Sequence, residues 1–514
     1  SINPAKILKS VVFPQPDGPR IEKNSPALIS KSIFFITCTP SKDLLNPLIT
    51  ISFFSNWTSL ILKLSNITIL SYLSKKINIL LFLLFFYTVF YGIMRKQITI
   101  LKEENMDSIT LQKYADLALK IGINLQDKQI LVIMSPVEAA PFTRILVETA
   151  YKMGAEEVVV HWNDDFCKKM KFTYGDVEIF ETMPQWEIDS LMFYAEKGAA
   201  FLSIAANDPE LLKGIDSTKI AKSQTARNVG LKGYYEKVMT NAIQWNIISV
   251  PTSAWAKKVF PNVSGEEAVE MLWKAIISSV KADTENPVET WHNHLKNLKE
   301  KMDYLNKKQF KKFIMKNSLG TDLTVQLPNK HIWASGKDTS KSGIDFVANI
   351  PTEEVFSMPY KYGVDGIVKA SKPLNYGGNL IEDFSLTFKD GKIIDFSAKS
   401  GEEALKNLIN TDEGAKYLGE IALVPYDSPI SNSNILFYNT LFDENASCHL
   451  AIGQAYPSCI EEGDTMDKKQ MEEAGMNDSL VHVDFMFGTK DLNITGVDAF
   501  GNEEPIFING NWAF

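Results

Sequence analysis

Two short motifs decide which fold and chemistry the sequence predicts: Asn445-Ala446-Ser447-Cys448-His449-Leu450-Ala451 and, further on, His482-Val483-Asp484. The chain has six His among 514 residues, and two of them stand in these motifs. Side chains alternate along a strand, so His482 and Asp484 share one face and can reach one ion together. Apolar neighbours from Leu480 to Phe487 predict a buried strand, in which an unpaired Asp is costly.

Acidic residues open two apolar segments upstream of these motifs. The segments are Ile350-Pro351-Thr352-Glu353-Glu354-Val355-Phe356 and Tyr417-Leu418-Gly419-Glu420-Ile421-Ala422-Leu423-Val424. An isolated His-x-Asp triplet is more often a core histidine bonded to a neighbouring carboxylate than a pair of metal ligands. Together, however, two Glu, two His and one Asp make a mixed nitrogen and oxygen donor set that suits two divalent ions.

The order of these motifs resembles that of the aminopeptidase T and aminopeptidase S family of dinuclear metallopeptidases. The resemblance runs from about Met106 to the C-terminus and rests on four segments: Asn349–Glu354, Gly419–Ala422, Ala446–Tyr456 and His482–Gly488. It implies metal ligands at Glu354, Glu420, His449, His482 and Asp484, with Tyr456 beside the metals. Either Glu353 or Glu354 can be the first ligand, and the family's spacing to Glu420 favours Glu354.

The same resemblance implies the reaction, that of a leucyl aminopeptidase of the thermophilic type. Such a metalloaminopeptidase, a hydrolase, removes N-terminal amino acids from peptides with a water activated by two divalent cations. We expect Glu420 to bridge the ions, Glu353 to act as general base, and Tyr456 to hydrogen-bond the oxyanion. Zinc is the expected metal, with cobalt, magnesium or manganese as alternatives. The family also implies a homodimer.

Composition indicates which binding partners and which cellular compartment are expected. The chain is 45% hydrophobic and 22% charged, which is typical of a globular protein. A net charge of −9 argues against nucleic acid as a partner, because proteins that bind phosphate backbones carry excess positive charge. Four Cys without CxxC spacing favour reduced thiols in a cytoplasmic protein.

Residues 1–105 are predicted to be a non-native or disordered extension. Residues 1–93 contain no Met and carry nine Lys and Arg against three Asp and Glu. The hydrophobic segment 77–93 has about the length of a short membrane span, and basic pairs flank it on both sides. A membrane anchor and a cleaved signal are the other interpretations, although no small-residue cleavage site is present. We favour an over-extended reading frame, with translation starting at Met94 or Met106, so a membrane partner is not expected.

From Met106 onwards, strands and helices alternate. Helical spacing predicts helices at Ile109–Ile123 and Ala140–Met153, and apolar runs predict strands at 129–134, 157–162, 199–204 and 245–250. This order implies parallel strands, so residues 106–305 are predicted to form an α/β domain with a parallel sheet. The turn Ser135–Ala140 has no glycine, which argues against a nucleotide site. The charged stretch Glu266–Lys308 is predicted to be a solvated helix that joins two domains.

Residues 306–514 are predicted to form an α+β, β-rich catalytic domain that holds all the metal ligands. Short alternating segments predict strands there, and Lys389-Asp390-Gly391-Lys392 predicts a tight hairpin. Two alternatives to the soluble enzyme remain open. One is a non-catalytic homologue that binds metal or peptide, and the other is the same peptidase anchored to a membrane by residues 77–93.

Overall fold

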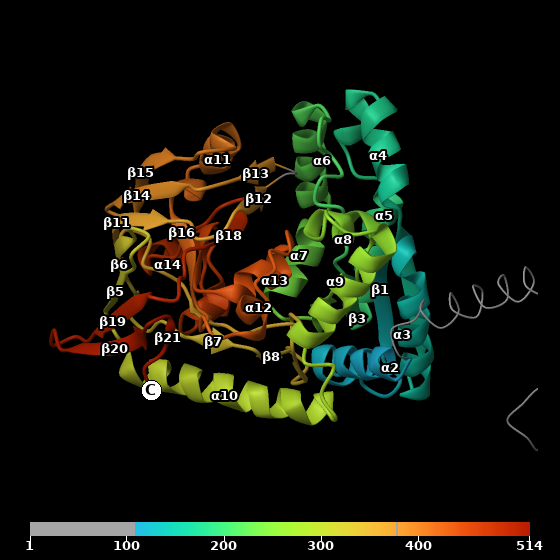
Figure 1. Cartoon of the computed structure of the whole chain (residues 1–514), viewed down its shortest axis with the longest axis horizontal. Helices are drawn as coiled ribbons and strands as arrows, with labels where there is room; N and C mark the ends of the chain where they lie inside the picture. The colour runs from blue at the N-terminus through green and yellow to red at the C-terminus, as the bar shows by residue number, and fades with distance from the viewer. Residues whose placement is uncertain (1–107, 377–378) are drawn as a thin grey trace, which may run out of the picture. The chain divides into compact units, whose positions relative to one another are not determined.

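The computed structural model describes residues 108–376 and 379–514. The predicted extension at 1–105, with its hydrophobic segment at 77–93, lies outside the described residues. Within them, no helix combines the length and apolar character that crossing a membrane requires. The described residues form one compact unit, in which an α/β part is followed by a strand-rich part (Figure 1).

The α/β part is built on a four-stranded sheet that is parallel, as the sequence predicts, and that has the order β2-β1-β3-β4. Its strands are β1 (Ile130–Pro136), β2 (Glu157–Asn163), β3 (Ala200–Ile204) and β4 (Trp245–Ile248). Its helices are α2 (Ser108–Leu117), η2 (Ala118–Gly122), η3 (Val137–Ala139), α3 (Ala140–Lys152), α4 (Asp165–Tyr174), η4 (Val177–Phe180), α5 (Gln185–Glu196), α6 (Ser217–Gly230), α7 (Lys232–Met239), α8 (Ser253–Val259) and α9 (Gly265–Ser279).

Helices cover both faces of this sheet. Leu131 and Ile133 of β1 pack in one apolar core with residues of α2, α3 and α9, whereas Val132 packs in a second core with residues of α5 and α7. A strand that is buried on both faces is apolar at every position. This explains why the stretch Ile130–Met134 shows no alternation of polar and apolar residues.

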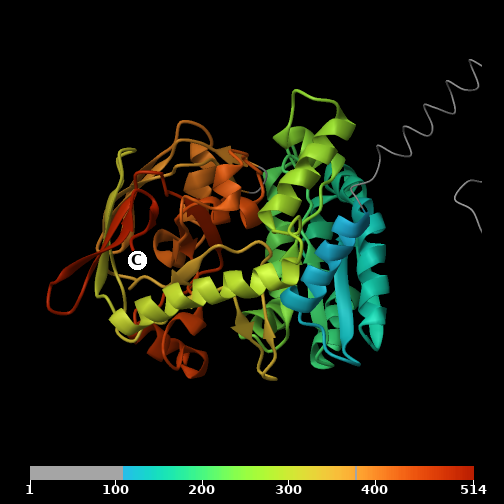
Figure 2. The ribbon, with the colours of Figure 1, turned by 60° about the horizontal axis from the view of Figure 1, so that its bottom comes forward.

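Helix α10 (Pro287–Lys308) links the α/β part to the strand-rich part (Figures 1 and 2). It begins after Asn286, whose side chain accepts a hydrogen bond from the backbone N–H of Glu289. Trp291 packs in the core of the α/β part, while Leu298 and Leu305 pack in the core of the strand-rich part. The predicted solvated helix is therefore wrong, because the stretch contains two helices and α10 buries one face.

The strand-rich part contains two large antiparallel sheets and the two-stranded pairs β8-β9 and β12-β13, which confirms the β-rich C-terminal half. The larger has the order β15-β14-β11-β6-β5-β19-β20-β21, and the smaller has the order β18-β17-β16-β10-β7. The strands are β5 (Lys312–Lys316), β6 (Asp322–Gln326), β7 (Ala334–Ser335), β8 (Asp338–Thr339), β9 (Asp345–Phe346), β10 (Val355–Ser357), β11 (Val364–Lys369), β12 (Leu374–Tyr376), β13 (Asn379–Ile381), β14 (Ser385–Lys389), β15 (Lys392–Ser397), β16 (Leu418–Leu423), β17 (His449–Gly453), β18 (His482–Met486), β19 (Asn493–Val497), β20 (Glu503–Ile508) and β21 (Asn511–Trp512).

Short helices connect these strands. They are α11 (Glu402–Ile409), η5 (Gly414–Lys416), α12 (Pro429–Asn432), α13 (Thr440–Asp443), η6 (Glu444–Ala446), η7 (Pro457–Cys459), η8 (Gly463–Thr465) and α14 (Lys468–Glu473). The predicted hairpin joins β14 to β15, and its turn residues Asp390 and Gly391 have φ angles of 49° and 80°. An Asp-Gly pair suits such a turn because both positions need positive φ.

The five-stranded sheet separates the apolar core of this part from a pocket. Leu418, Ile421 and Leu423 of β16 pack in the core together with Leu450 of β17 and Phe485 of β18. The opposite face of the same strands carries Glu420, His449, His482 and Asp484, which all line the pocket.

Candidate metal centre

The consecutive acids before β10 point to different sides of the chain. Side chains alternate in extended backbone. Glu354 and Phe356 both line the pocket, whereas Val355 between them packs in the apolar core. Glu353 is directed away from the pocket, where its carboxylate contacts the Lys281 ammonium group. Of the two acids that the sequence leaves open as first ligand, Glu354 is therefore the one beside the other candidate ligands.

A β-bulge turns Glu420 toward the same pocket. The pairing of β16 with β17 shifts between Leu418 and Glu420, so Gly419 is the extra residue. A Cβ atom on Gly419 would lie 2.1 Å from the carbonyl oxygen of Gln454, too close for any side chain. Because of the bulge, Leu418 faces the apolar core and Glu420 faces the pocket, although they are two residues apart.

Antiparallel pairing of β17 with β18 adds the two histidines and Asp484. Asp484 pairs with Ala451, and His482 pairs with Gly453. Paired residues project from the same face, so Glu420, Ala451 and Asp484 form a row across three neighbouring strands. Ala451 is the middle residue of this row, and the His482 imidazole lies within 3.6 Å of both acids. His482 and Asp484 share a face as predicted, with Nε2 and Oδ1 3.4 Å apart.

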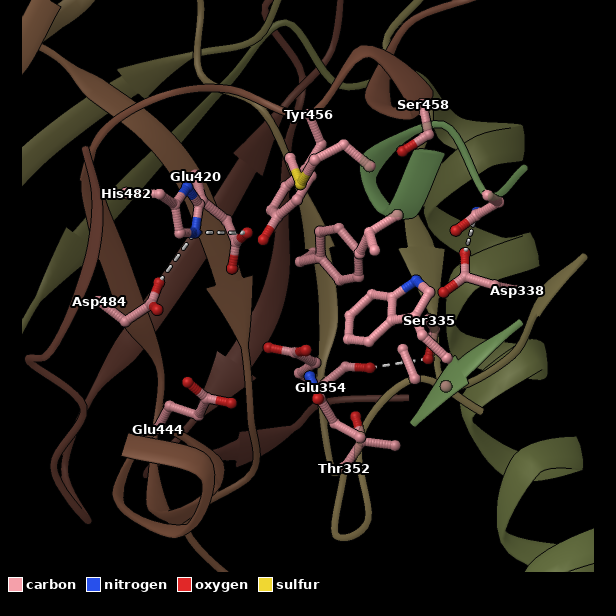
Figure 3. Close-up of a pocket in the computed structure, with 18 of the residues that line it drawn as sticks. Ser335, Asp338, Thr352, Glu354, Glu420, Glu444, Tyr456, Ser458, His482 and Asp484 are labelled. Atoms are coloured by element: carbon pink, nitrogen blue, oxygen red, sulfur yellow. Dashed lines mark hydrogen bonds and ion pairs between the residues drawn. The ribbon is translucent and has the colours of Figure 1, made fainter. Parts of the chain in front are cut away.

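The side chains of Glu354, Glu420, His482 and Asp484 converge in Figure 3, and distances place His449 among them. His449 Nε2 lies 3.1 Å from Glu354 Oε2 and 3.4 Å from Glu420 Oε1. His482 Nε2 lies 3.6 Å from Glu420 Oε2. The donor atoms form two groups, and the atoms of each group lie within 4.8 Å of one another. One group contains Glu354, Glu420 and His449, and the other contains Glu420, His482 and Asp484. Glu420 belongs to both groups, which is the arrangement of a bridging carboxylate.

Burial and like charges oppose the ionisation of Glu420, the carboxylate shared by both groups. Burial raises the pKa of Glu420 to about 7, and the negative charges of Asp484 and Glu354 add to the effect, while the hydrogen bond from His449 lowers it. Burial alone would lower the pKa of His482, but the carboxylates of Asp484 and Glu420 raise it to about 9. Hydrogen bonds to Glu354 and Glu420 likewise raise the pKa of His449 well above its ordinary value, despite burial. The site therefore favours positive charge.

The donor set fits two divalent cations. Asp484 Oδ1 is buried and accepts no hydrogen bond from the described residues, although His482 Nε2 is 3.4 Å away. An ionised oxygen in this state is costly unless a cation takes it. The Nδ1–H of His482 donates to the Gln454 carbonyl at 2.7 Å, which leaves Nε2 free to bind a metal. Carboxylates combined with imidazoles accept zinc, cobalt, manganese or magnesium.

Tyr456 lies beside this cluster, where the sequence predicts it. Its ring centroid is 4.8 Å from that of His482, and it lines the pocket. Burial, together with the negative charge of Glu420 and Asp484, raises the pKa of its hydroxyl well above the ordinary value. The hydroxyl therefore stays protonated at neutral pH and can donate a hydrogen bond.

Glu444 is a pocket residue that the sequence reasoning missed. It is buried on η6, and in Figure 3 its carboxylate faces the space between Glu354 and Asp484. Burial and the charges of Asp484 and Glu354 raise its pKa well above the ordinary value. In the sequence, Glu444 is marked by its position five residues before His449, but unlike the other candidate acids it does not stand at the start of a strand.

Glu353 belongs to a separate buried network. Besides Lys281, its carboxylate lies 3.7 Å from His294 Nε2, and its backbone N–H donates to Asn445 Oδ1 at 2.7 Å. His294 Nε2 is also 2.8 Å from the Thr352 carbonyl oxygen. Burial lowers the pKa of His294, with the charge of Glu353 opposing that shift. These contacts hold the segment that carries Glu354, and they come from the end of α9 and from α10.

The pocket has a volume of about 120 Å³ and a second wall from the α/β part. That wall consists of Val238 and Met239 of α7, Asn241, and Trp245 of β4. Asp338 of β8 also lines the pocket, and Asn241 Nδ2 donates a hydrogen bond to Asp338 Oδ1 at 3.2 Å. The candidate ligands thus all lie in the strand-rich part, but the space they face is completed by the α/β part.

Several known proteins are similar to this chain in sequence, and a solved structure is similar to it in fold. Aminopeptidase AmpS of Bacillus subtilis is 49% identical over 411 residues, which cover 80% of this chain and 100% of that protein. Aminopeptidase 2 of Geobacillus stearothermophilus is 50% identical over 404 residues, which cover 79% of this chain and 98% of that protein. The solved structure of wild-type AmpT from Thermus thermophilus is similar with a TM-score of 0.74 and 36% identity, over 79% of this chain and 99% of that one.

The family described as thermophilic metalloprotease (M29) matches residues 107–512. The resemblance inferred from the four motifs is thus confirmed, and the chain belongs to the M29 family of metalloproteases.

Proposed function

We propose that the chain removes N-terminal amino acids from peptides with two divalent cations held by Glu354, Glu420, His449, His482 and Asp484. Because it belongs to the M29 family and its relatives are named aminopeptidases, the chain is a metalloaminopeptidase. The pair of donor groups that share Glu420 is the observation that carries the dinuclear proposal. When bound, the cations would polarise the scissile carbonyl and lower the pKa of water.

Glu444 is a better candidate than Glu353 for the group that accepts a proton. The Glu353 carboxylate is paired with Lys281 and does not line the pocket. Glu444 lines the pocket, and burial raises its pKa above that of an ordinary carboxyl, which makes its ionised form a stronger base. Tyr456 has a protonated hydroxyl next to His482, from which it would donate to the oxygen that becomes negative in the transition state.

Zinc is the metal that we propose for both positions, with cobalt, magnesium or manganese as alternatives. The two imidazole nitrogens favour zinc over magnesium, whereas the three carboxylates admit any of these ions. All candidate ligands lie within the catalytic domain that we propose for residues 306–514. The α/β domain proposed for residues 106–305 contributes the opposite wall of the pocket and would position the peptide.

A homodimer that works in the cytoplasm is the assembly that we propose. Large apolar side chains are exposed on consecutive helices α4 to α6: Phe166 is 69% exposed, Tyr174 79%, Trp186 69% and Val229 71%. Such exposure on neighbouring elements is typical of a protein interface. Cys167, Cys448 and Cys459 are all free, and reduced thiols are typical of proteins in the cytoplasm.

Hydrolysis of leucine p-nitroanilide tests the proposed function. We expect the purified protein to release p-nitroaniline, to lose this activity in a chelator, and to regain it when zinc or cobalt is added back. Intact protein that carries metal but hydrolyses no aminoacyl substrate would instead be a non-catalytic homologue. Release from leucine p-nitroanilide but not from its N-acetyl derivative would show that a free α-amine is required.

A further inference from the structure

Asp338 is an acidic pocket residue that belongs to neither donor group. In Figure 3 it lies across the pocket from His482 and Asp484. Its half-buried carboxylate accepts a hydrogen bond from the neutral Asn241 side chain at 3.2 Å, and no Lys, Arg or His of the described residues forms an ion pair with it. Burial raises the pKa of this carboxyl, although the Asn241 hydrogen bond opposes the shift. Asp338 therefore lacks a cationic partner.

The surfaces near Asp338 suit a long side chain with a cationic end. Val238 and Met239 offer an apolar wall, and the aromatic residues Trp245 and Phe356 line the same pocket. The methylene groups of Lys and Arg pack well on apolar surface, and their charged ends bind both carboxylates and aromatic faces. One carboxylate next to aromatic rings is therefore a binding site for an ammonium or guanidinium group.

We propose that Asp338 determines specificity for the first amino acid of the peptide and favours Arg or Lys at that position. This inference rests on the proposed aminopeptidase function. The free α-amine is two bonds from the scissile carbonyl carbon, so it must lie beside the candidate metal ligands. Asp338 lies across the pocket from His482 and Asp484, on the side where a long side chain of the first amino acid would extend.

Arginine and citrulline p-nitroanilides provide the test, because citrulline has nearly the shape of arginine without its charge. We expect wild-type kcat/KM to be about 10- to 100-fold higher for the arginine substrate. In Asp338→Asn this ratio should fall to about 1, while kcat/KM for leucine p-nitroanilide changes less than about threefold. Asp338→Glu keeps the charge and should retain a preference of several-fold. Folding of each variant is checked by circular dichroism.

Asp345→Asn is the matched control. Asp345 is an exposed acid on β9, the strand paired with β8, and its carboxylate contacts Lys337 and accepts a hydrogen bond from Thr339. The variant removes the same charge nearby without touching the pocket, so it should keep the wild-type ratio of arginine to citrulline. Calorimetric titration with free L-arginine and L-citrulline gives a second measure that does not need turnover. Wild type should bind arginine at least fivefold more tightly, and Asp338→Asn should bind both equally.

Three results would overturn the inference. The first is a ratio of arginine to citrulline near 1 in the wild type, or one that Asp338→Asn leaves unchanged. The second is an equal loss on all substrates, leucine included, which would place the α-amine on Asp338. The third is a loss of bound metal in Asp338→Asn, which would make Asp338 a ligand. Wild-type hydrolysis of leucine p-nitroanilide tests the proposed function separately from all three.

Discussion

Glu353 and Glu354 are neighbours in the chain, but their carboxylates meet different histidines: Glu354 Oε2 lies 3.1 Å from His449 Nε2, and Glu353 Oε2 lies 3.7 Å from His294 Nε2. The first contact belongs to the candidate metal centre. The second belongs to a buried network in which Glu353 also contacts Lys281. We therefore expect the two adjacent acids to have separable roles, Glu354 as a metal ligand and Glu353 in holding the segment that leads into β10.

Replacing Glu353 should mainly affect stability. In Glu353→Gln the Lys281 ammonium group, whose side chain is only 16% exposed, loses its charged partner. Removing one member of a buried pair costs about 3 kcal/mol of unfolding free energy, and Lys281→Met in the same chain should restore part of it. Urea denaturation measures the change. The kcat should fall less than about tenfold; a loss of a thousandfold or more with both ions still bound would make Glu353 the general base after all.

Replacing Glu420 should remove both ions, whereas replacing Asp484 should remove one. Glu420 is shared by the two donor groups, and Asp484 belongs only to the second. Metal analysis of dialysed protein should give two ions per chain for the wild type, none for Glu420→Gln and one for Asp484→Asn. Glu300→Gln, which changes an exposed acid on α10, serves as the control and should keep two. Two tightly bound ions in Glu420→Gln would refute the bridging role.

Replacing Glu444 should slow the chemical step without releasing metal. Its carboxylate lines the pocket but belongs to neither donor group. We expect Glu444→Gln to lower kcat by about 10²- to 10⁴-fold, the usual contribution of a general acid or base. The KM should change little and the metal content not at all. Steady-state kinetics with metal analysis on the same samples checks this, and kcat within threefold of the wild type would exclude the role.

Asp443 should make stability fall as pH rises through the mildly acidic range. Burial raises the pKa of this carboxyl from 3.8 to about 6, although backbone N–H groups of Phe437 and Asn439 bond to it. The folded state thus holds the proton more tightly than the unfolded state. The contribution of Asp443 to stability is therefore greatest below about pH 4, and it is lost as the pH rises from about 4 to about 6. The contribution is about 3 kcal/mol at most.

The measurement for Asp443 is a difference between two proteins. Denaturation of wild type and Asp443→Asn in the presence of a chelator, from pH 4 to pH 7, should give curves that diverge in slope between about pH 4 and pH 6. Other titrating groups cancel in the comparison. Parallel curves would mean that Asp443 has an ordinary pKa.

The exposed side chains on α4 to α6 should control assembly. Glutamate at positions Tyr174 and Trp186 puts charge into the proposed contact surface, so Tyr174→Glu/Trp186→Glu is expected to be monomeric. Phe500→Glu is the control, because Phe500 is 90% exposed but lies between β19 and β20. Light scattering reports the mass of each protein. An unchanged dimer in the double variant would place the interface elsewhere, and a wild-type monomer would end the homodimer proposal.

Local patterns predicted much of the fold and of the candidate ligand set. Alternation places His482 and Asp484 on one face whatever the rest of the chain does, and continuous apolar runs identify β1 and β3. The start of one helix was also predictable, at Ala140, where periodic apolar residues begin.

Roles that depend on distant contacts were not predictable in this way. Lys281 meets Glu353 across 72 positions of sequence, and Asp338 meets Asn241 across 97. Nothing local distinguishes these residues from the many surface Lys and Asp of the chain. His294 was expected on a solvated helix, because the charged residues around it conceal that Trp291 and Leu298 turn one face of α10 inward. Glu444 was missed because it lies on a single 3-10 turn rather than at a strand start.

Ala451 pairs with Glu420 on one neighbouring strand and with Asp484 on the other, so its side chain belongs to the same row as the two acids. We expect a branched side chain there, such as valine, to crowd the candidate centre while leaving all five candidate ligands chemically intact. Metal binding would then weaken for steric reasons, although every oxygen and nitrogen donor would still be present. A residue that coordinates nothing can in this way limit which ions the centre accepts.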